Sequence, residues 1–299
     1  MPVIAVHDLH KAYGDIRAVD GIDLAVEPGE FFGVLGPNGA GKTTTLELIE
    51  GIRKPDSGTI EVLGQAPWPR NPALLPRIGV QHQATAFFDF LSAREQLLVF
   101  ADLYGSPHSR VDELLAQVGL SDFAGHLTKK LSGGQQQRLS IAAALVHDPE
   151  LVFLDEPSAA LDPQARRNLW DLLQGFNDEG RTLVLTTHYI EEAEHLCDRV
   201  AIIDHGKILA VDTPAALVRS LAAPTRISLP DLAVERTVAD ALVGADRVEV
   251  TDGTMTLTTD QPSRVLTALA ERQALDGLSV RGATLDDVFL QLTGREFRV

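Results

Sequence analysis

Residues 36–43 (GPNGAGKT) form a glycine-rich segment between the apolar run 31–35 and the helical stretch 44–49. The segment fits the pattern G-x-x-x-x-G-K-[ST], in which backbone N–H groups turn inward around phosphate oxygens at the start of a helix. Such a match can arise by chance, but a strand before it and a helix after it are the context that the pattern requires. The sequence therefore predicts an α/β fold with a phosphate site at the end of one strand.

The residue types in this segment assign parts of the phosphate site. Lys42 is expected to reach the β and γ phosphates of a nucleotide, and Thr43 is expected to be a ligand of Mg²⁺. The residues expected to contact the nucleotide are Gly36, Pro37, Asn38, Gly39, Ala40, Gly41, Lys42, Thr43 and Thr44.

Three runs in the sequence are almost continuously apolar, as is typical of parallel strands that are covered on both faces. They are residues 31–35, 151–154 and 182–185. Each run ends in a polar or glycine-rich cluster, and ligands of open α/β sheets bind beyond the carboxyl ends of such strands. We therefore expect the chemistry to gather near Gly36, Asp155 and His188.

Two adjacent acids, Asp155 and Glu156, follow the second of these runs. Successive strand residues point to opposite faces, so the two carboxylates can take separate tasks. Asp155 suits the Mg²⁺ shell, and Glu156 suits the polarisation of an attacking water. The alternative is a plain strand end before the turn at Pro157.

The rest of the chain divides into an antiparallel layer, a helical insert and a C-terminal series of strands and helices. Alternating segments at 3–6, 22–26 and 59–63 predict the antiparallel layer. Helical patterns predict an insert at about 84–148. Pro224 marks a boundary, which gives expected domains at 1–221 and 225–299.

Residues 131–135 (LSGGQ), followed by 136–138 (QQR), resemble the signature motif of ABC ATPases. Taken alone, they are a glycine-rich helix start with Ser132 as the N-cap, which also offers N–H groups to an anion. The resemblance implies that Ser132 and Gly134 face the γ-phosphate of ATP on the opposite subunit's loop, so that a head-to-tail homodimer completes the site on ATP binding. The residues assigned to nucleotide binding here are Ser132, Gly133, Gly134 and Gln135.

The same resemblance extends to further positions. Tyr13 resembles the aromatic residue on which adenine stacks, although a core tyrosine beside a turn is the alternative. Gln83 matches the glutamine that contacts Mg²⁺, the attacking water and the membrane partner, with Gln81 as its rival. His188 resembles the switch histidine that contacts the γ-phosphate. Residues 158–162 (SAALD) resemble the D-loop, with two alanines where glycine-containing pairs are common.

The resemblance implies a P-loop NTPase fold of the ABC ATPase type: a mixed sheet core, an antiparallel β layer and a helical subdomain, with a small C-terminal α+β domain. Residues 188–194 and 283–296 resemble the ABC-2 exporter group, similar to the ATPase of daunorubicin-type drug resistance systems. This implies an ATPase, with ATP and Mg²⁺ as cofactors, that powers efflux of a drug, lipid or polysaccharide through a separate ABC-2 type permease. An importer ATPase and a soluble ABC ATPase are the alternatives.

Charge and hydropathy restrict the partners. The chain carries 42 acidic residues against 26 Lys and Arg, a net charge of −16, whereas affinity for nucleic acid comes from basic groups that displace counterions. We therefore expect no nucleic acid partner. The single cysteine, Cys197, cannot form an intrachain disulfide and favours a reducing compartment. No window approaches the roughly 20 apolar residues of a membrane span, so the expected location is the cytoplasmic face of the cell membrane, reached through the permease.

Overall fold

The computed structural model describes residues 1–83, 87–159, 161–221, 224–230, 247–251 and 253–294. The chain divides into two compact units, Met1–Pro214 and Ala215–Glu296. The assignment of residues 1–221 and 225–299 as domains remains a prediction. The first residues of the expected helical insert (84–86), Ala160 of the expected D-loop and residues 295–296 of the tail motif lie outside the described residues.

A six-stranded sheet forms the centre of the first unit, with the strand order β5-β6-β7-β3-β8-β9. The strands are β3 (Phe31–Leu35), β5 (Ile78–Gln81), β6 (Leu151–Asp155), β7 (Thr182–Thr187), β8 (Arg199–Asp204) and β9 (Lys207–Asp212). The first five in this order are mutually parallel, and β9 runs antiparallel to β8, so the sheet is mixed. Strands β3, β6 and β7 are buried along their whole length, which accounts for their continuous apolar sequences.

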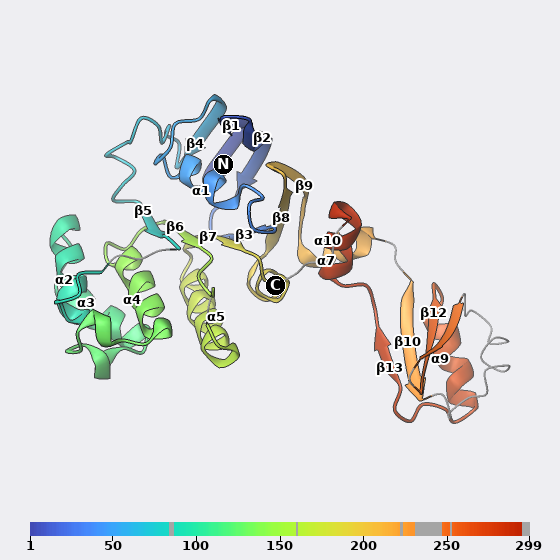
Figure 1. Cartoon of the computed structure of the whole chain (residues 1–299). Coiled ribbons are helices and arrows are strands. Elements are labelled where there is room, and N and C mark those ends of the chain that lie inside the picture. The colour runs from blue at the N-terminus through green and yellow to red at the C-terminus, as the bar shows by residue number, and fades with distance from the viewer. Residues whose placement is uncertain (84–86, 160, 222–223, 231–246, 252, 295–299) are drawn as a thin grey trace. The chain divides into compact units, whose positions relative to one another are not determined.

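A second, antiparallel sheet packs over the first and has the order β2-β1-β4. Its strands are β1 (Ile4–Tyr13), β2 (Ile16–Val26) and β4 (Ser57–Val62). Inward side chains of this layer share one hydrophobic core with helix α1 (Lys42–Ile49) and with β3 and β6. Figure 1 shows α1 between the two sheets, so the helix that follows the phosphate loop is held from both sides.

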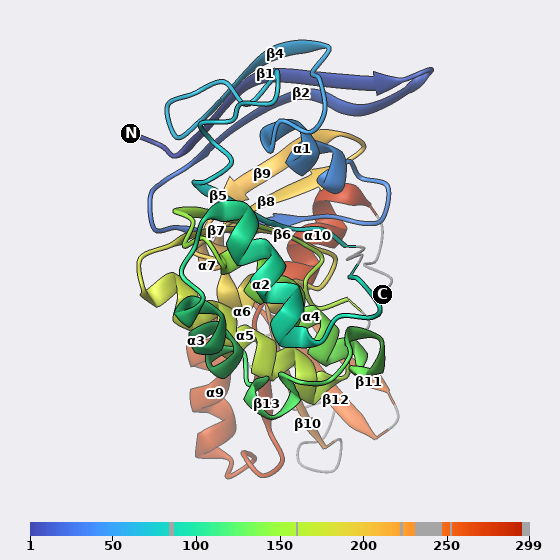
Figure 2. The same cartoon turned by 90° about the vertical axis from the view of Figure 1, so that its left-hand side faces the viewer.

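Helices α2 (Ala93–Tyr104), α3 (Ser109–Gln117) and α4 (Gly133–Leu145) form the helical insert, and Figure 2 shows them grouped at one side of the central sheet. Ser92 and Ser132 begin α2 and α4 with capping boxes, in which the Ser side chain and the third helical residue satisfy each other's backbone N–H groups. Helix α5 (Pro163–Asp178) follows β6, and α6 (Ile190–Leu196) follows β7. None of the described helices is both long and apolar enough to cross a membrane.

The second unit contains a four-stranded antiparallel sheet with the order β11-β12-β10-β13. Its elements are α7 (Pro214–Ser220), which begins at the boundary, β10 (Thr225–Pro230), β11 (Arg247–Thr251), β12 (Thr254–Thr259), α9 (Pro262–Glu271), β13 (Ser279–Arg281) and α10 (Leu285–Thr293). Helix α9 packs on one face of the sheet through Val265 and Leu269, which meet Ile227 and Leu257. The unit therefore has a small core of its own, and Thr284 caps α10 in a capping box with Asp287.

Candidate functional site

Residues 36–43 join the end of β3 to the start of α1 in a loop that requires glycine at two close approaches. A Cβ atom on Gly36 would lie 2.3 Å from the carbonyl oxygen of Ile203, and one on Gly41 would lie 2.1 Å from that of Ala18. Gly41 also has φ 103, a left-handed conformation that side chains disfavour. The loop is thus fixed between β8 and β2 by contacts that no larger residue permits.

The start of α1 is suited to an anion. Its N-cap residue is Gly41, and no side chain caps the helix. The first N–H groups of a helix have no partner within the helix, and they stand at the positive end of its dipole. An N-terminus without a side-chain cap therefore leaves donors for phosphate oxygens.

Lys42 extends back over the same loop. Its ammonium group donates to the carbonyl oxygens of Gly36 at 2.9 Å and of Pro37 at 3.2 Å. The same nitrogen lies 3.2 Å from Oε1 of Glu156, and the Lys42 side chain is only 4% exposed. The structure therefore places a buried positive charge at the position that the loop motif assigns to phosphate recognition.

Asp155 ends β6 beside Thr43. Thr43 Oγ1 donates to the two carboxylate oxygens of Asp155 at 3.2 and 3.1 Å, and Thr186 Oγ1 from β7 donates to Oδ1. Asp155 is buried, and no cationic side chain pairs with it in the described part of the chain. A carboxylate and a hydroxyl side by side are hard oxygen ligands, and Mg²⁺ needs only one or two protein carboxylates when phosphates complete its shell. The donor set therefore fits the expected ion.

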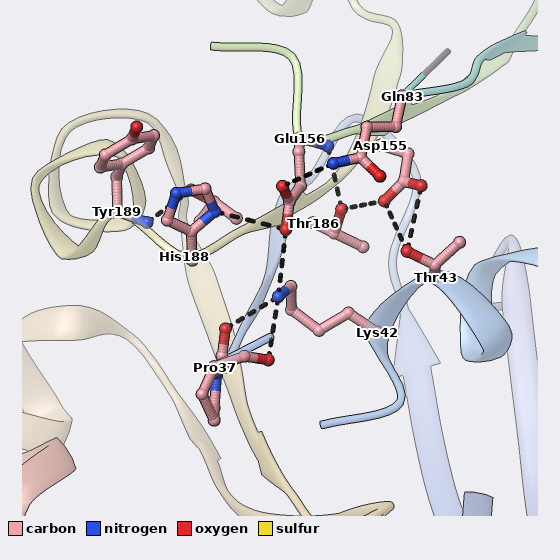
Figure 3. A network of polar contacts seen from close by, with 11 residues as sticks. Pro37, Lys42, Thr43, Gln83, Asp155, Glu156, Thr186, His188 and Tyr189 are labelled. Carbon is pink, nitrogen blue, oxygen red and sulfur yellow. Dashed lines mark hydrogen bonds and ion pairs between the residues drawn. The ribbon is translucent and has the colours of Figure 1, made fainter. Parts of the chain in front are cut away.

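Three side chains approach the carboxylate of Glu156, one from the start of α1, one from the segment after β5 and one from the turn after β7 (Figure 3). Besides Lys42, it is contacted by His188 Nδ1, 3.3 Å from Oε1, and by Gln83 Nε2, which donates to Oε2 at 3.2 Å. Its own backbone has φ 48, an unusual conformation for a residue with a side chain. The Glu156 N–H donates to Thr186 Oγ1 at 3.0 Å and so ties this conformation to β7.

The two candidate glutamines have different surroundings. Gln81 is the last residue of β5 and is buried, and its Nε2 donates to the carbonyl oxygen of His82 at 2.6 Å. Gln83 is exposed and reaches Glu156. Geometry therefore favours Gln83 as the residue that approaches the acidic pair.

The other expected site residues are not brought to this cluster. The side chains of Ser132 and Gln135 hydrogen-bond to each other's backbone at the start of α4, and no described hydrogen bond or ion pair joins residues 132–135 to the phosphate loop. Tyr13 ends β1 and is 42% exposed, so it is not a core residue. Its ring lies near the cations of Lys11 and Arg53.

Two residues near the site had no expected role. Thr186 forms hydrogen bonds with both Asp155 and Glu156. The sequence feature that could have indicated this contact is a hydroxyl residue at the end of an apolar strand. Glu192 on α6 is fully buried, and burial raises the pKa of its carboxyl group. The indole of Trp170 donates to its Oε1 at 3.0 Å. Glu192 therefore joins α6 to α5 through a buried hydrogen bond.

Comparisons with known proteins show the family of the chain. The family model described as ABC transporter matches residues 19–159, and a model for an AAA domain matches 128–192. The chain is 39% identical to the Nod factor export ATP-binding protein I of Burkholderia lata and 40% identical to that of Paraburkholderia xenovorans, with all of each chain covered.

Solved structures show the same fold over the larger part of the chain. The protein cbiO1 from Clostridium perfringens, part of the ABC transporter complex cbiONQ, matches with a TM-score of 0.67 and 30% identity over 74% of this chain and 94% of that one. A dimeric ATP-binding cassette in a post-hydrolysis state, bound to ADP and Pi, matches with a TM-score of 0.64 and 29% identity over 70% of this chain and 98% of that one.

Proposed function

This chain belongs to the family of ABC transporter ATP-binding subunits, and from that premise we propose that its Glu156 cluster hydrolyses ATP for an exporter built with a separate ABC-2 type permease. The chain is an ATP-binding ABC ATPase of the export type, as its full-length relatives are. Their names, which specify export, favour this function over the importer and over the soluble ATPase. The fold is the expected P-loop NTPase of the ABC type.

One observation carries the assignment of the chemistry: a single carboxylate, that of Glu156, is approached by Lys42, His188 and Gln83. We assign to Glu156 the acceptance of a proton from the water that attacks the γ-phosphorus. The bond from that phosphorus to the bridging oxygen breaks, and ADP and phosphate leave. A general base of this kind contributes about 10²- to 10⁴-fold to a rate.

The remaining residues bind and orient the substrate. Lys42 and the N–H groups at the start of α1 hold the phosphates, and His188 stands where it can donate to the γ-phosphate or orient Glu156. Thr43, Asp155 and Gln83 are proposed to hold Mg²⁺, which when bound neutralises phosphate charge. Tyr13 offers an exposed ring for adenine.

The signature segment, residues 132–135, is proposed to act on the partner's nucleotide. Its polar groups are turned to their own helix start and not to the phosphate loop of the same chain, and Ser132 is exposed at the N-terminus of α4. A head-to-tail dimer would place this second anion-binding helix end opposite the loop. The similar cassette solved as a dimer with ADP and Pi supports this arrangement.

We place the chain at the cytoplasmic face of the cell membrane, held there by the permease. The relatives are named for export of Nod factor, and for this chain a drug, a lipid or a polysaccharide is proposed as cargo. The test is to purify the chain with its permease and reconstitute both in vesicles. We expect ATP-dependent movement of a candidate cargo across the vesicle membrane. The Glu156→Gln variant should lose this movement. Failure of the two proteins to associate would contradict the exporter assignment.

A further inference from the structure

The sheet of the second unit has two faces of different character. Helix α9 packs on one face, against Ile227 and Leu257. Successive strand residues point to opposite faces, so the alternate residues of the same strands form the other face, called the outer face below. Apart from Pro230, its residues are polar or charged: Arg226, Ser228, Arg247, Glu249, Thr251, Thr254, Thr256, Thr258, Ser279 and Arg281.

Three arginines lie in one row across the outer face. Arg226 is paired in register with Arg281 on one side and with Thr258 on the other, and Thr258 is paired in turn with Arg247. Like charges directly opposite each other destabilise a sheet. The row therefore lowers the stability of the sheet unless negative charge accompanies it.

Two carboxylates of the second unit lie beside this row. Glu249 forms an ion pair with Arg247 at 2.7 Å. Burial would raise the pKa of Asp287, but hydrogen bonds at the start of α10 and the charges of Arg226 and Arg281 hold that pKa below its ordinary value. Three cations thus stand beside two carboxylates, and one positive charge is left without a counter-charge among these residues. It is a positive site on a chain whose net charge is −16.

A hollow of about 500 Å³ lies over the row, and sites for small molecules span roughly 300 to 1,000 Å³. Arg226 and Arg247 line its two sides, and Thr256 and Thr258 of the strand between them line it as well. Neighbouring strands are about 4.8 Å apart, so the backbones of the two arginines are roughly 10 Å apart. Both side chains are long enough to reach a group above Thr258.

The donors around the hollow match a phosphoryl group. A guanidinium group presents five N–H donors in a planar fork that fits the oxygens of phosphate or carboxylate. Here two guanidinium groups can approach from opposite sides, with the hydroxyl of Thr258 as a third donor. The phosphoryl group of a monoester has three terminal oxygens that accept from three directions. A carboxylate has two oxygens in one plane and would leave one of these donors unpaired.

We propose that the outer face binds a small soluble phosphate monoester, whose phosphoryl group lies between Arg226 and Arg247 over Thr258. The rest of the ligand extends along β11 and β12, where Thr256 and Glu249 can accept hydrogen bonds from its hydroxyl groups. The carboxylates beside the row disfavour a nucleic acid or an anionic membrane, which bind to continuous basic areas. Every residue that lines the hollow belongs to the second unit, so the inference is independent of the proposed function.

The test measures equilibrium binding of glycerol 3-phosphate to the full chain. Arg226→Gln and Arg247→Gln are expected to weaken binding by about tenfold or more, because each removes hydrogen bonds to a charged group. Thr258→Val keeps the shape of the side chain without its hydroxyl and should weaken binding by about fivefold. Arg264→Gln, at an exposed position of α9 on the other side of the sheet, is the matched control and should bind like the wild type. Lys42→Ala should also bind the probe normally, which separates this site from the phosphate loop.

Melting temperatures test whether the arginines serve the fold instead. Arg226→Gln removes the like-charge pair with Arg281, so without the probe it should melt no lower than the wild type. Glycerol 3-phosphate should raise the melting temperature of the wild type but not that of Arg226→Gln. A lower melting temperature of Arg226→Gln without the probe would show a structural role and overturn the inference.

Four results of the binding experiment would also overturn the inference. The first is no binding of glycerol 3-phosphate at millimolar concentration, and the second is equal binding of glycerate, which carries a carboxylate in place of the phosphoryl group. The third is a loss of binding in Lys42→Ala or Arg264→Gln as large as that in Arg226→Gln. The fourth is tighter binding to phosphatidylglycerol vesicles through Arg226 and Arg247, which would assign the face to lipid headgroups.

Discussion

The ammonium nitrogen of Lys42 lies 3.2 Å from Oε1 of Glu156, so the residue proposed to hold phosphate and the residue proposed to activate water are paired with each other. His188 approaches the same oxygen at 3.3 Å. A phosphate on the loop would compete for Lys42, and the carboxylate would then be released toward water. In this arrangement the proposed general base would become available only when its substrate has arrived.

Glu156→Gln is expected to lower ATP turnover by about 10²- to 10⁴-fold, because the amide cannot accept the proton of the attacking water. ATP affinity should stay close to that of the wild type, since Lys42 and the helix start are unchanged. Steady-state hydrolysis and nucleotide titration measure the two effects. Glu191→Gln, an exposed acid on α6, is the control. Turnover within a factor of a few of the wild type would remove Glu156 from this role.

Lys42→Ala is expected to weaken ATP binding and also to destabilise the nucleotide-free chain. The substitution leaves the carboxylate of Glu156, which is 9% exposed, without its cation, and such a loss costs up to about 3 kcal/mol. Adding Glu156→Gln should recover much of that loss, because the uncompensated charge disappears. Denaturant unfolding of the two single variants and the double variant measures this. Additive losses would show that the ion pair contributes nothing.

Ser132→Arg is expected to abolish hydrolysis while leaving ATP binding at its own phosphate loop. A mixture with Lys42→Ala should regain activity, because each mixed dimer has one site with both an intact Lys42 and an intact Ser132. With equal amounts and random pairing, about a quarter of the wild-type sites are restored. Hydrolysis is measured as a function of the mixing ratio. A mixture with no more activity than its parents would contradict a site completed by the partner.

Glu50→Gln is expected to change how stability depends on pH in the isolated chain. The folded chain holds the Glu50 proton to about pH 8, whereas the ordinary value for the unfolded chain is 4.5. Between these values the folded state binds more protons, so the free energy of unfolding falls as pH rises. Gln cannot ionise, so the variant should match the wild type near pH 5 and be more stable above pH 8, by up to about 4 kcal/mol. Parallel curves from pH 5 to 9 would contradict the burial of this acid.

A chain that ends at Pro214 is expected to fold and to bind ATP, because the phosphate loop, Asp155 and Glu156 all lie in the first unit. We expect it to dimerise less well or to couple poorly to transport, since contact is the work proposed for the second unit. Melting temperature, ATP affinity, dimer formation and efflux are compared with those of the full chain. Unchanged dimerisation and efflux would leave the second unit without this contact role.

The sequence predicts those elements whose pattern is local. Strands β3, β6 and β7 are buried on both faces, so their apolar runs are unbroken, and Ser132 precedes α4 as a capping residue should. Strand β1 continues to Tyr13, past the expected residues 3–6. The alternating pattern stops at residue 6 because the pairing register shifts between Val6 and Leu9. The β8–β9 hairpin was not predicted.

Contacts between segments that are distant in the sequence could not be predicted from local patterns. The pairing of Lys42 with Glu156 joins a loop to a strand end, and the choice of Gln83 over Gln81 depends on where β5 stops. Family resemblance gave the roles of these residues but not their contacts. The hydrogen bond of Thr186 and the raised pKa of Glu50 both depend on residues of other elements that pack against them. Neither residue stands in a local sequence pattern that predicts this.

The left-handed backbone of Glu156, with φ 48, has a consequence for directed evolution of this protein. A residue with a side chain held in such a conformation costs on the order of 1 kcal/mol, which glycine would not incur. Glycine at position 156 would remove this cost, but it would also leave the buried ammonium group of Lys42 without its counter-ion, a loss of up to about 3 kcal/mol. A selection for heat resistance alone should therefore retain the acid at this position, even though its backbone conformation is unfavourable.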